Sequence, residues 1–338
     1  MILTDYPNIK YIYDYPSCNK SSKSVSFGTS YNTVEDNNGQ IYHIEGSNLY
    51  KDDEQVLSVT TSNLIKNPLY YDSTTNTYWI GLDKKIIQPQ FWLQNSSQSS
   101  NTGFTADARA SQGESFLNFA VQGNKVYLIY IDYEDSSDPN IIYFTKDENV
   151  KLTEQNRIQI SSIDGVSGEV TDMAVLEDGT VAVLVRSVGV GTETEGFGGN
   201  MSLIDKGTVY SRGALVLLSS DLSKVEKVLG WTDSPRTIKA TGEDTENPVK
   251  KWTSITAYIP EYEERNSHFY GPVKIVAIRP KELVIADCGA NFVLPDYDGK
   301  KNGKMYAHNR LMTVNLRNFA IGCKKEFSED ELKFQNLS

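Results

Sequence analysis

The sequence predicts an all-β protein, a β-propeller of about six four-stranded antiparallel blades. Three observations lead to this prediction. Apolar residues alternate with a period of two, as in strands. Two kinds of hairpin recur in a fixed order. The first kind returns about every 50 residues, the length of a propeller blade.

The first kind of hairpin has a small residue followed by an aliphatic one, then a polar turn and a second apolar strand. The clearest copy is "VTDMAVLEDGTVAVLV", Val170–Val185, in which Asp178 and Gly179 predict a tight turn with positive φ. The other copies are Phe116–Asp132, Val273–Asp287 and, more weakly, Pro68–Asp83. The small residues Ala120, Ala174 and Ala277 are expected near a crowded axis.

The second kind of hairpin lies between these copies, at Ile141–Leu152, Ala214–Leu229 and Arg310–Ile321. One hairpin of each kind makes a four-stranded sheet that cannot bury both faces alone, so blades must stack. The chain length gives six blades, with five or seven as alternatives and the first near Ser24–Leu57. A β-sandwich is the runner-up. It explains the alternation but not the recurring pair of hairpins.

We therefore expect one propeller domain over residues 1–338. Two stretches interrupt the pattern, 189–207 and 232–268, and each is expected to be an insertion or, for the second, a degenerate blade. Residues 328–338 predict a short C-terminal helix, with Ser328 as N-cap and Glu331 as its capping-box partner.

Composition and charge favour a globular protein and disfavour nucleic-acid binding and a membrane-spanning helix. Hydrophobic residues make up 39% and charged residues 23%, which is typical of globular chains. The net charge of -11 is spread along the sequence and disfavours nucleic acid as a partner. No stretch approaches the roughly 20 apolar residues of a membrane-spanning helix. Loops rich in Ser, Asn, Thr and Tyr favour an exported protein whose leader is absent from this sequence, and a cytoplasmic protein is the alternative.

The cysteine and histidine residues match no metal-binding motif. Cys18, Cys288 and Cys323 form no zinc pattern, and we expect three buried thiols, with pairing of Cys288 and Cys323 as the alternative. His43, His268 and His308 lie in no metal-binding motif, and we expect neither a metal nor a cofactor.

Two loops resemble known motifs only in part. The stretch Gly189–Asn200 is rich in glycine but lacks a basic residue for phosphate, so we expect a mobile lid or a surface excursion. The stretch Asp296–Lys304 begins like a calcium loop, but Lys300 stands at a ligand position, so an ordinary turn is favoured.

The last blade resembles a known family. "KELVIADCGANF" and "NRLMTVNLRNFAIG" are similar to the closing segment of exported bacterial propeller lipoproteins, and the first-kind hairpins resemble those of NHL-type six-bladed propellers. Cys288 stands where the lipoprotein pattern has Asp. The resemblance implies the fold and no activity. Asp287 and Arg310, at the strand ends of this blade, are expected to hold it together rather than to do chemistry.

The sequence favours a binding module. Aromatic residues near amide side chains suit a protein or glycan ligand, and we expect the ligand to meet loops at one mouth of the propeller. The predicted binding residues are Trp92, Trp231, Trp252, Tyr262 and Tyr270. The alternative is a glycan-acting hydrolase or lyase with carboxylates at that mouth, and a structural scaffold is the third hypothesis. A monomer is expected.

Overall fold

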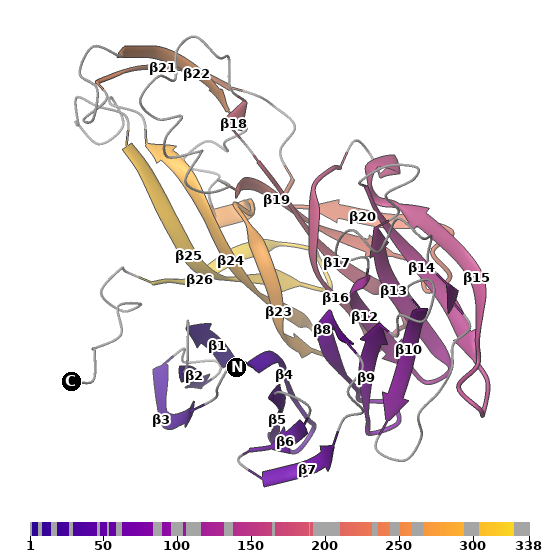
Figure 1. Ribbon diagram of the computed structural model, residues 1–338. Helices are drawn as coiled ribbons and strands as arrows, with labels where there is room; N and C mark the ends of the chain where they lie inside the picture. Colours follow the sequence, from indigo (N-terminus) through magenta and orange to yellow (C-terminus); the bar gives the residue numbers. More distant parts are fainter. Residues whose placement is uncertain are drawn as a thin grey trace. The chain divides into compact units, whose positions relative to one another are not determined.

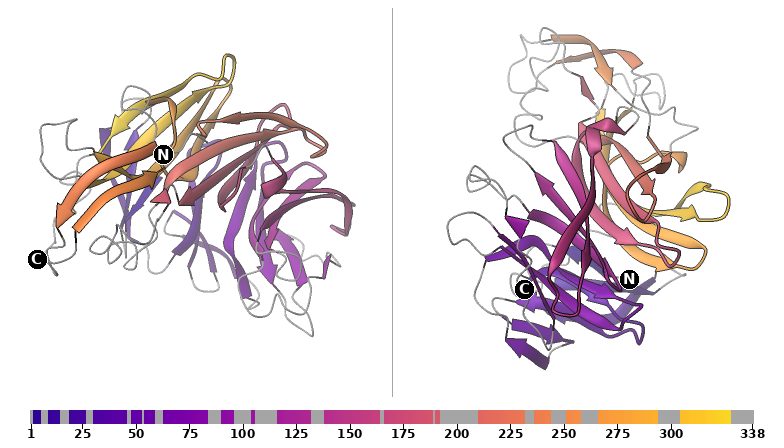
Figure 2. Two further views of the ribbon diagram at one scale, coloured as in Figure 1. Left: turned by 90° about the horizontal axis from the view of Figure 1, so that it is seen from above. Right: turned by 90° about the vertical axis from the view of Figure 1, so that its right-hand side faces the viewer.

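The structure is a computed structural model of the 338-residue chain. It describes residues 2–5, 9–14, 19–26, 30–45, 48–52, 54–58, 63–83, 90–95, 104–105, 116–131, 138–163, 166–188, 190–191, 210–231, 236–243, 251–257, 266–293 and 304–327. Strands dominate these residues (Figures 1 and 2). No helix among them is long and apolar enough to span a membrane.

Five four-stranded antiparallel sheets form the blades, numbered here in chain order. Blade 1 has β4 (Ser30–Glu35), β5 (Ile41–Glu45), β6 (Asn48–Lys51) and β7 (Glu54–Ser58). Blade 2 has β8 (Asn63–Asp72), β9 (Thr77–Asp83), β10 (Gln90–Asn95) and β11 (Phe104–Thr105). Blade 3 has β12 (Phe116–Gln122), β13 (Lys125–Ile131), β14 (Pro139–Lys146) and β15 (Leu152–Gln159), followed by the short 3-10 helix η2 (Ile160–Ser162).

The last two blades carry the longest connections. Blade 4 has β16 (Glu169–Val175), β17 (Val181–Val188), β19 (Tyr210–Leu218) and β20 (Val225–Leu229). Blade 5 has β23 (Pro272–Arg279), β24 (Glu282–Val293), β25 (Lys304–Asn315) and β26 (Ile321–Glu326). The strands thus divide into many small sheets rather than the two sheets of a sandwich, and the fold class is the predicted β-propeller.

The described residues form five blades, where the chain length suggested six. The difference arises because two further sheets have three strands each and lie outside the blades. One contains β1 (Ile2–Asp5), β2 (Ile9–Asp14) and β3 (Asn19–Ser26). The other contains β18 (Val190–Gly191), β22 (Lys251–Ala257) and β21 (Arg236–Glu243). The prediction of six blades divided the whole chain length by the length of one blade, so it assigned the residues of these two sheets to a blade.

Each blade has two different edges. Consecutive strands are antiparallel, so the first-to-second and third-to-fourth connections leave the same edge, which we call the turn edge. The second-to-third connection and the link to the next blade leave the opposite edge, which we call the insertion edge.

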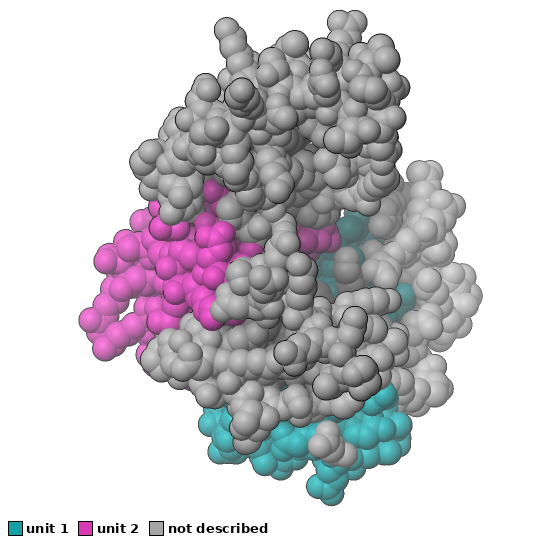
Figure 3. All heavy atoms as spheres, turned by 90° about the vertical axis from the view of Figure 1, so that its left-hand side faces the viewer, with its two compact units in different colours: residues 1–165, 173–182, 218–226 teal, residues 166–172, 183–217, 227–338 magenta. Residues whose placement is uncertain are grey.

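The chain forms two compact units (Figure 3). Unit 1 comprises residues 1–165, 173–182 and 218–226, and unit 2 comprises 166–172, 183–217 and 227–338. The division passes through blade 4, so the turn edge of that blade belongs to unit 1 and its insertion edge to unit 2.

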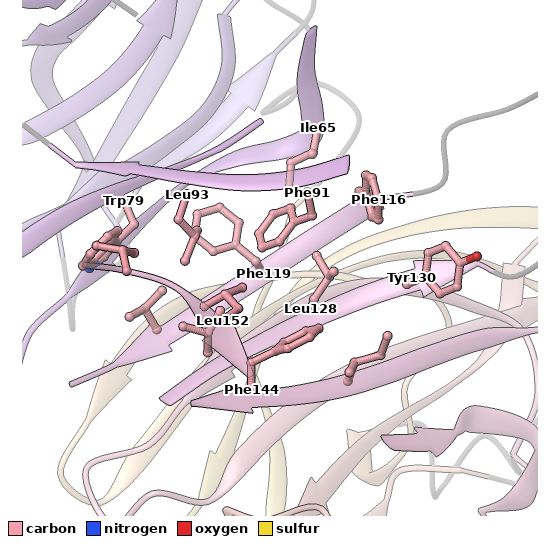
Figure 4. Packing of buried hydrophobic residues seen from close by; sticks show 14 residues of the cluster. Ile65, Trp79, Phe91, Leu93, Phe116, Phe119, Leu128, Tyr130, Phe144 and Leu152 are labelled. Carbon is pink, nitrogen blue, oxygen red and sulfur yellow. The ribbon is translucent and has the colours of Figure 1, made fainter. Parts of the chain in front are cut away.

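In unit 1, the first strands of neighbouring blades lie in contact, β4 against β8 and β8 against β12. Apolar side chains of blades 2 and 3 form one cluster (Figure 4). Gly81 is required at its centre, because a Cβ there would lie 2.8 Å from Ile65 Cδ1 and 2.9 Å from Phe119 Cε1. A second cluster joins blades 1 and 2, and includes Ile44, Leu69 and Ile80.

All the hairpins predicted from the sequence are present. The stretch Val170–Val185 forms β16 and β17, whose turn is closed by Leu176 N donating to Thr180 O at 2.9 Å. Gly179 takes a φ of 89°, as its predicted role requires, while Asp178 keeps a negative φ and bonds the amide of Thr180. The turn therefore needs left-handed backbone only at the glycine.

The cysteine predictions are wrong for the two described cysteines. Cys288 lies on β24 and is exposed rather than buried, and Cys323 lies on β26 and is partly exposed. They do not form a disulfide with each other, because β25 separates their strands: Cys288 pairs with Asn309 and Cys323 with Met312. Cys18 and the helix predicted at 328–338 lie outside the described residues.

Candidate binding site at the insertion edge of blades 4 and 5

The long connections of unit 2 leave its blades at the insertion edge. They are residues 189–209 between β17 and β19, 230–271 between β20 and β23, and 294–303 between β24 and β25. The turn edge of blade 5, by contrast, is closed by short turns such as 280–281. Connections on a rigid scaffold are where binding residues concentrate, so this edge is the first candidate site.

The insertion edges of blades 4 and 5 point the same way. Thr171 Oγ1 donates to the Pro272 carbonyl at 2.8 Å, and the Ile275 amide donates to Asp172 Oδ2 at 2.8 Å. Lys274 Nζ lies 3.4 Å from Asp172 Oδ1. These contacts set the starts of β16 and β23 side by side, so all three long connections emerge on one side of unit 2.

Two of the connections join in a sheet of their own. In β18, from the first connection, Val190 pairs with Ala257 and Gly191 with Thr256 of β22. In the second connection, β21 pairs with β22 from Arg236–Ala257 to Glu243–Lys251. Strands β18, β22 and β21 from the two insertions are therefore joined in one sheet (Figure 1).

At the point where the second insertion starts, an arginine covers a tryptophan. The Arg212 guanidinium lies 3.7 Å from the ring centroid of Trp231, a cation–π contact. The indole nitrogen of Trp231 is buried and has no hydrogen-bond partner among the described residues. Beneath it, Gly230 has a φ of 75° and touches the Phe269 ring, so a side chain at position 230 would collide with that ring.

A buried ion pair fixes the end of the same insertion. Asp287 and Arg310 are 0% and 1% exposed and pair across β24 and β25. Asp287 also accepts hydrogen bonds from the amides of Tyr270 and Gly271, and Arg310 donates to the His268 carbonyl at 2.9 Å. The pair therefore ties two strands to the segment before β23, which confirms the predicted structural role of both residues.

Partly exposed polar groups lie near this core. Arg186 pairs with Glu169 across β17 and β16 at 2.9 Å. Ser267 Oγ lies 3.2 Å from His268 Nδ1. Cys288 is exposed on β24, although burial around its thiol raises the pKa of that group to about 11. Among the described residues, no group of three or more His, Cys, Asp or Glu is arranged to hold a metal ion.

The five predicted binding residues all belong to insertion edges or insertions. Trp92 lies on β10 near the insertion edge of blade 2, partly buried against the apolar cluster of unit 1. Trp231 begins the second insertion and Trp252 lies on β22. Tyr262 lies outside the described residues. Tyr270 is fully buried beneath Arg310, with the guanidinium 4.2 Å from its ring centroid, so its ring presents no surface to a ligand.

The remaining candidates from the sequence are scattered. His43 is buried on β5 and stacks on Tyr50, with ring centroids 5.2 Å apart. His308 lies on β25 opposite Gly289. Apart from β18 and Lys304, the stretches Gly189–Asn200 and Asp296–Lys304 lie outside the described residues.

Sequence reasoning missed a tyrosine cluster at the turn edges of blades 1 and 2. Tyr42 and Tyr78 stack with centroids 3.9 Å apart, and Tyr71 lies 5.1 Å from Tyr78. Burial, and then hydrogen bonds with Tyr42 and Asp36, raise the pKa of the Tyr78 hydroxyl. The sequence shows Tyr71 and Tyr78 flanking one turn, but their contact with blade 1 bridges residues 42 apart, which local periodicity cannot show.

The chain is similar to one family model over part of its length and to several solved structures. A family model described as the TdpA C-terminal domain matches residues 240–335, well under half of the chain. No curated protein matches. A putative TolB from Agrobacterium tumefaciens is 11% identical, with a TM-score of 0.49, over 95% of this chain and 88% of that one. A protein from Lactobacillus plantarum is 8% identical, with a TM-score of 0.44, over 94% and 91% of the two chains.

A third solved structure, described as regucalcin, a calcium-binding protein from Agrobacterium tumefaciens, is 8% identical. Its TM-score is 0.41, and the match covers 95% of this chain and 85% of that one. Similarity at this level says nothing about a ligand of this chain. The strand topology itself defines the fold class. Closeness to NHL-type propellers or to exported lipoproteins remains a prediction.

Proposed function

We propose that this protein is a binding module whose ligand, a protein or a glycan, contacts the insertion edge of blades 4 and 5. One observation carries the proposal: the three long connections of unit 2 leave the same side, and two of them build the sheet β18–β22–β21. Long connections at one edge of a packed scaffold commonly carry binding residues. We therefore assign ligand binding to the surface that these connections form.

The scaffold beneath this surface is rigid. The pair Asp287–Arg310 and the contact of Arg212 with Trp231 anchor both ends of the second insertion. A preorganised surface loses less conformational entropy when a ligand binds, which favours affinity. Trp231 and Trp252 are the predicted binding residues that we place on this surface.

A glycan-acting hydrolase or lyase is the alternative. Glycoside hydrolysis needs two carboxyl groups about 5 to 9.5 Å apart, one of them free to act as an acid. Two described carboxylates at this edge already form ion pairs: Asp287 is buried against Arg310, and Glu169 pairs with Arg186. The observations therefore favour binding over catalysis.

The test uses the full chain on a glycan array and on a displayed library of random peptides, followed by titration of each hit with tryptophan fluorescence as the readout. We expect hits whose affinity falls at least about tenfold in Trp252→Ala or Trp231→Ala. The matched control is Tyr143→Ala, an aromatic at the opposite edge of blade 3, which should leave affinity unchanged. Blank screens with the folded wild type, or hits indifferent to both tryptophans, would overturn the proposal. Release of reducing sugar from an array hit would favour the hydrolase.

We extend the proposal to the oligomeric state, the location and the relatives of the protein. We propose a monomeric exported protein related to NHL-type propellers and to bacterial propeller lipoproteins, on the strength of its last blade and its polar loops. Analytical ultracentrifugation tests the monomer. Fractionation of cells that express the native gene tests export, and a cytoplasmic location would contradict it.

A further inference from the structure

The tyrosine cluster of unit 1 forms a short stack that ends at the protein surface. Tyr42 of blade 1 is 8% exposed and stacks on Tyr78 of blade 2 at 3.9 Å, with the planes 26° apart. Tyr71 follows at 5.1 Å and contacts no other ring in the described residues. Both Tyr71 and Tyr78 are partly exposed. The stack therefore has a buried end, Tyr42, and an outer end, Tyr71.

Hydrogen bonds from the two turns hold these rings in place. The Tyr78 hydroxyl donates to Asp36 Oδ2 at 3.0 Å, and the other oxygen of Asp36 accepts from the amides of Asn38 and Gln40. The Tyr71 hydroxyl donates to Asn76 Oδ1 at 2.7 Å. The outer ring is thus oriented before any ligand arrives, which lowers the entropic cost of binding.

Two exposed asparagines contact the hydroxyl of the outer ring. Asn76 sits in the left-handed region with a φ of 53°, and Tyr71 occupies only its amide oxygen, which leaves the amide nitrogen as a donor. Asn37 contributes its backbone amide to the Tyr71 hydroxyl at 3.4 Å, and its own side chain has no hydrogen bond with the described residues. A partly exposed aromatic ring beside exposed amide groups matches a ligand with an apolar face and hydroxyl groups around it.

The charges near the rings favour a neutral ligand. Asp36 and Asp72 are buried, and both accept several hydrogen bonds from their own turns. Asp72 also accepts from the Gly123 amide at 2.9 Å. Fixed carboxylates repel an anionic ligand, and because they are already hydrogen-bonded they offer little to a cationic one.

We propose that Tyr71, Asn37 and Asn76 form a carbohydrate-binding subsite for a neutral pyranose at the turn edges of blades 1 and 2. The sugar stacks one apolar face on the Tyr71 ring while its hydroxyls bond the two amides. A proline-rich peptide also stacks on aromatic rings, but it has no rim of hydroxyls for the amides to bond. The subsite is separate from the insertion edge and does not depend on binding there.

The test titrates the full chain with neutral oligosaccharides of glucose, mannose and xylose, using NMR and calorimetry. We expect binding to at least one of them, with affinity reduced at least about tenfold by Tyr71→Ala and within about threefold of wild type in Tyr71→Phe, which keeps the ring. Asn76→Gly, which tolerates the same backbone, should weaken binding without changing the thermal melting temperature. Tyr143→Ala, another turn-edge tyrosine, should bind like wild type.

Four outcomes overturn the subsite. One is no binding of these sugars by the folded wild type at millimolar concentration. Another is binding that survives in a folded Tyr71→Ala protein. The third is binding of a proline-rich peptide in place of the sugars. Binding lost only in Trp231→Ala or Trp252→Ala would place the carbohydrate at the insertion edge, which supports the proposed function and contradicts this subsite.

Discussion

Two residues in the middle of β24 and β25 show how charge is used inside this protein. Asp287 and Arg310 are buried together, and every described partner of Asp287 is a hydrogen-bond donor. A buried pair of this kind adds little net stability when complete. Removing one member lowers the stability of the folded protein, because the other charge stays buried without its partner.

We expect Arg310→Met to lower the free energy of unfolding by about 3 to 5 kcal/mol, because Asp287 would remain buried without a cation. Chemical denaturation monitored by circular dichroism measures the change. Arg157→Met is the matched control: its pair with Glu154, at 2.8 Å, is exposed, and its loss should cost under about 1 kcal/mol. Equal effects of the two variants would contradict a structural role specific to the buried pair.

Asp221 provides a residue-scale prediction about pH. Hydrogen bonds from the Ser223 side chain and amide and from the Ser219 hydroxyl lower its pKa from the ordinary value of 3.8 to about 2. A lowered folded pKa means that the stabilisation is present above pH 3.8 and is lost as pH falls toward 2.

NMR titration of the side-chain carboxyl should therefore give Asp221 a midpoint near 2. Ser223→Ala removes the largest cause, so the midpoint should move up toward the ordinary value. An unshifted Asp221 in the wild type would show that the turn does not hold its hydroxyls in place.

At the scale of elements, the same turn design recurs in different blades. The third-to-fourth-strand turns of blades 3, 4 and 5 each place a large apolar residue in the left-handed region: Val150, Leu222 and Phe319, at φ of 61°, 57° and 60°. Such backbone is unfavourable for a β-branched residue such as Val150. Val150 and Leu222 are each 3% exposed, so burial of the side chain offsets the strain.

Contacts between the turns of neighbouring blades link the elements of unit 1. Asp36 of blade 1 bonds Tyr78 of blade 2, Asp72 of blade 2 bonds the Gly123 amide of blade 3, and Gln122 bonds the Leu176 carbonyl of blade 4. Each bond bridges residues at least 42 apart, so it forms only once both hairpins are in place.

We expect Asp72→Ala to increase hydrogen exchange at the Gly123 amide, because that amide loses its acceptor. The thermal melting temperature should fall too, since hydrogen bonds to charged groups are worth about 1.5 to 3 kcal/mol. Asp147→Ala is the control: Asp147 bonds the amides of Asn149 and Lys151 in its own turn. Unchanged exchange at Gly123 in Asp72→Ala would contradict a link between the blades.

At the scale of the whole molecule, the insertions show how distant segments combine. The sheet β18–β22–β21 joins the connection after β17 to the connection after β20, although β19 and β20 lie between them in the chain. Neither insertion supplies this sheet alone.

A pair of cysteines tests this arrangement. Val190 and Ala257 are directly opposite in antiparallel strands, where Cβ atoms are about 4.5 to 5.5 Å apart, near the range of a disulfide. In a chain with Cys18, Cys288 and Cys323 replaced by serine, Val190→Cys with Ala257→Cys should oxidise to an intramolecular disulfide, seen by mass spectrometry. The pair Val190→Cys with Trp252→Cys, distant in register, should not. Equal oxidation of both would contradict the register.

The sequence by itself determined the blades. Alternation of apolar residues and glycine-containing turns are local properties, so they predicted the hairpin Val170–Val185 and its counterparts, and the pairing of the two hairpin kinds predicted the propeller. The structural role of Asp287 and Arg310 could also be predicted from their place in one recognisable blade. Their predicted position at strand ends is wrong, because β24 and β25 are 12 residues long and the pair lies in the middle of both.

Only the tertiary structure decided how the segments between the blades are used. The number of blades, the burial of Tyr270, the exposure of Cys288 and the stack of Tyr42, Tyr78 and Tyr71 depend on residues brought together from distant parts of the chain. The physical reason is that hydrogen bonding within a hairpin is set by neighbouring residues. Packing between hairpins depends on contacts between residues that are far apart in the sequence, and a local sequence pattern does not predict these contacts.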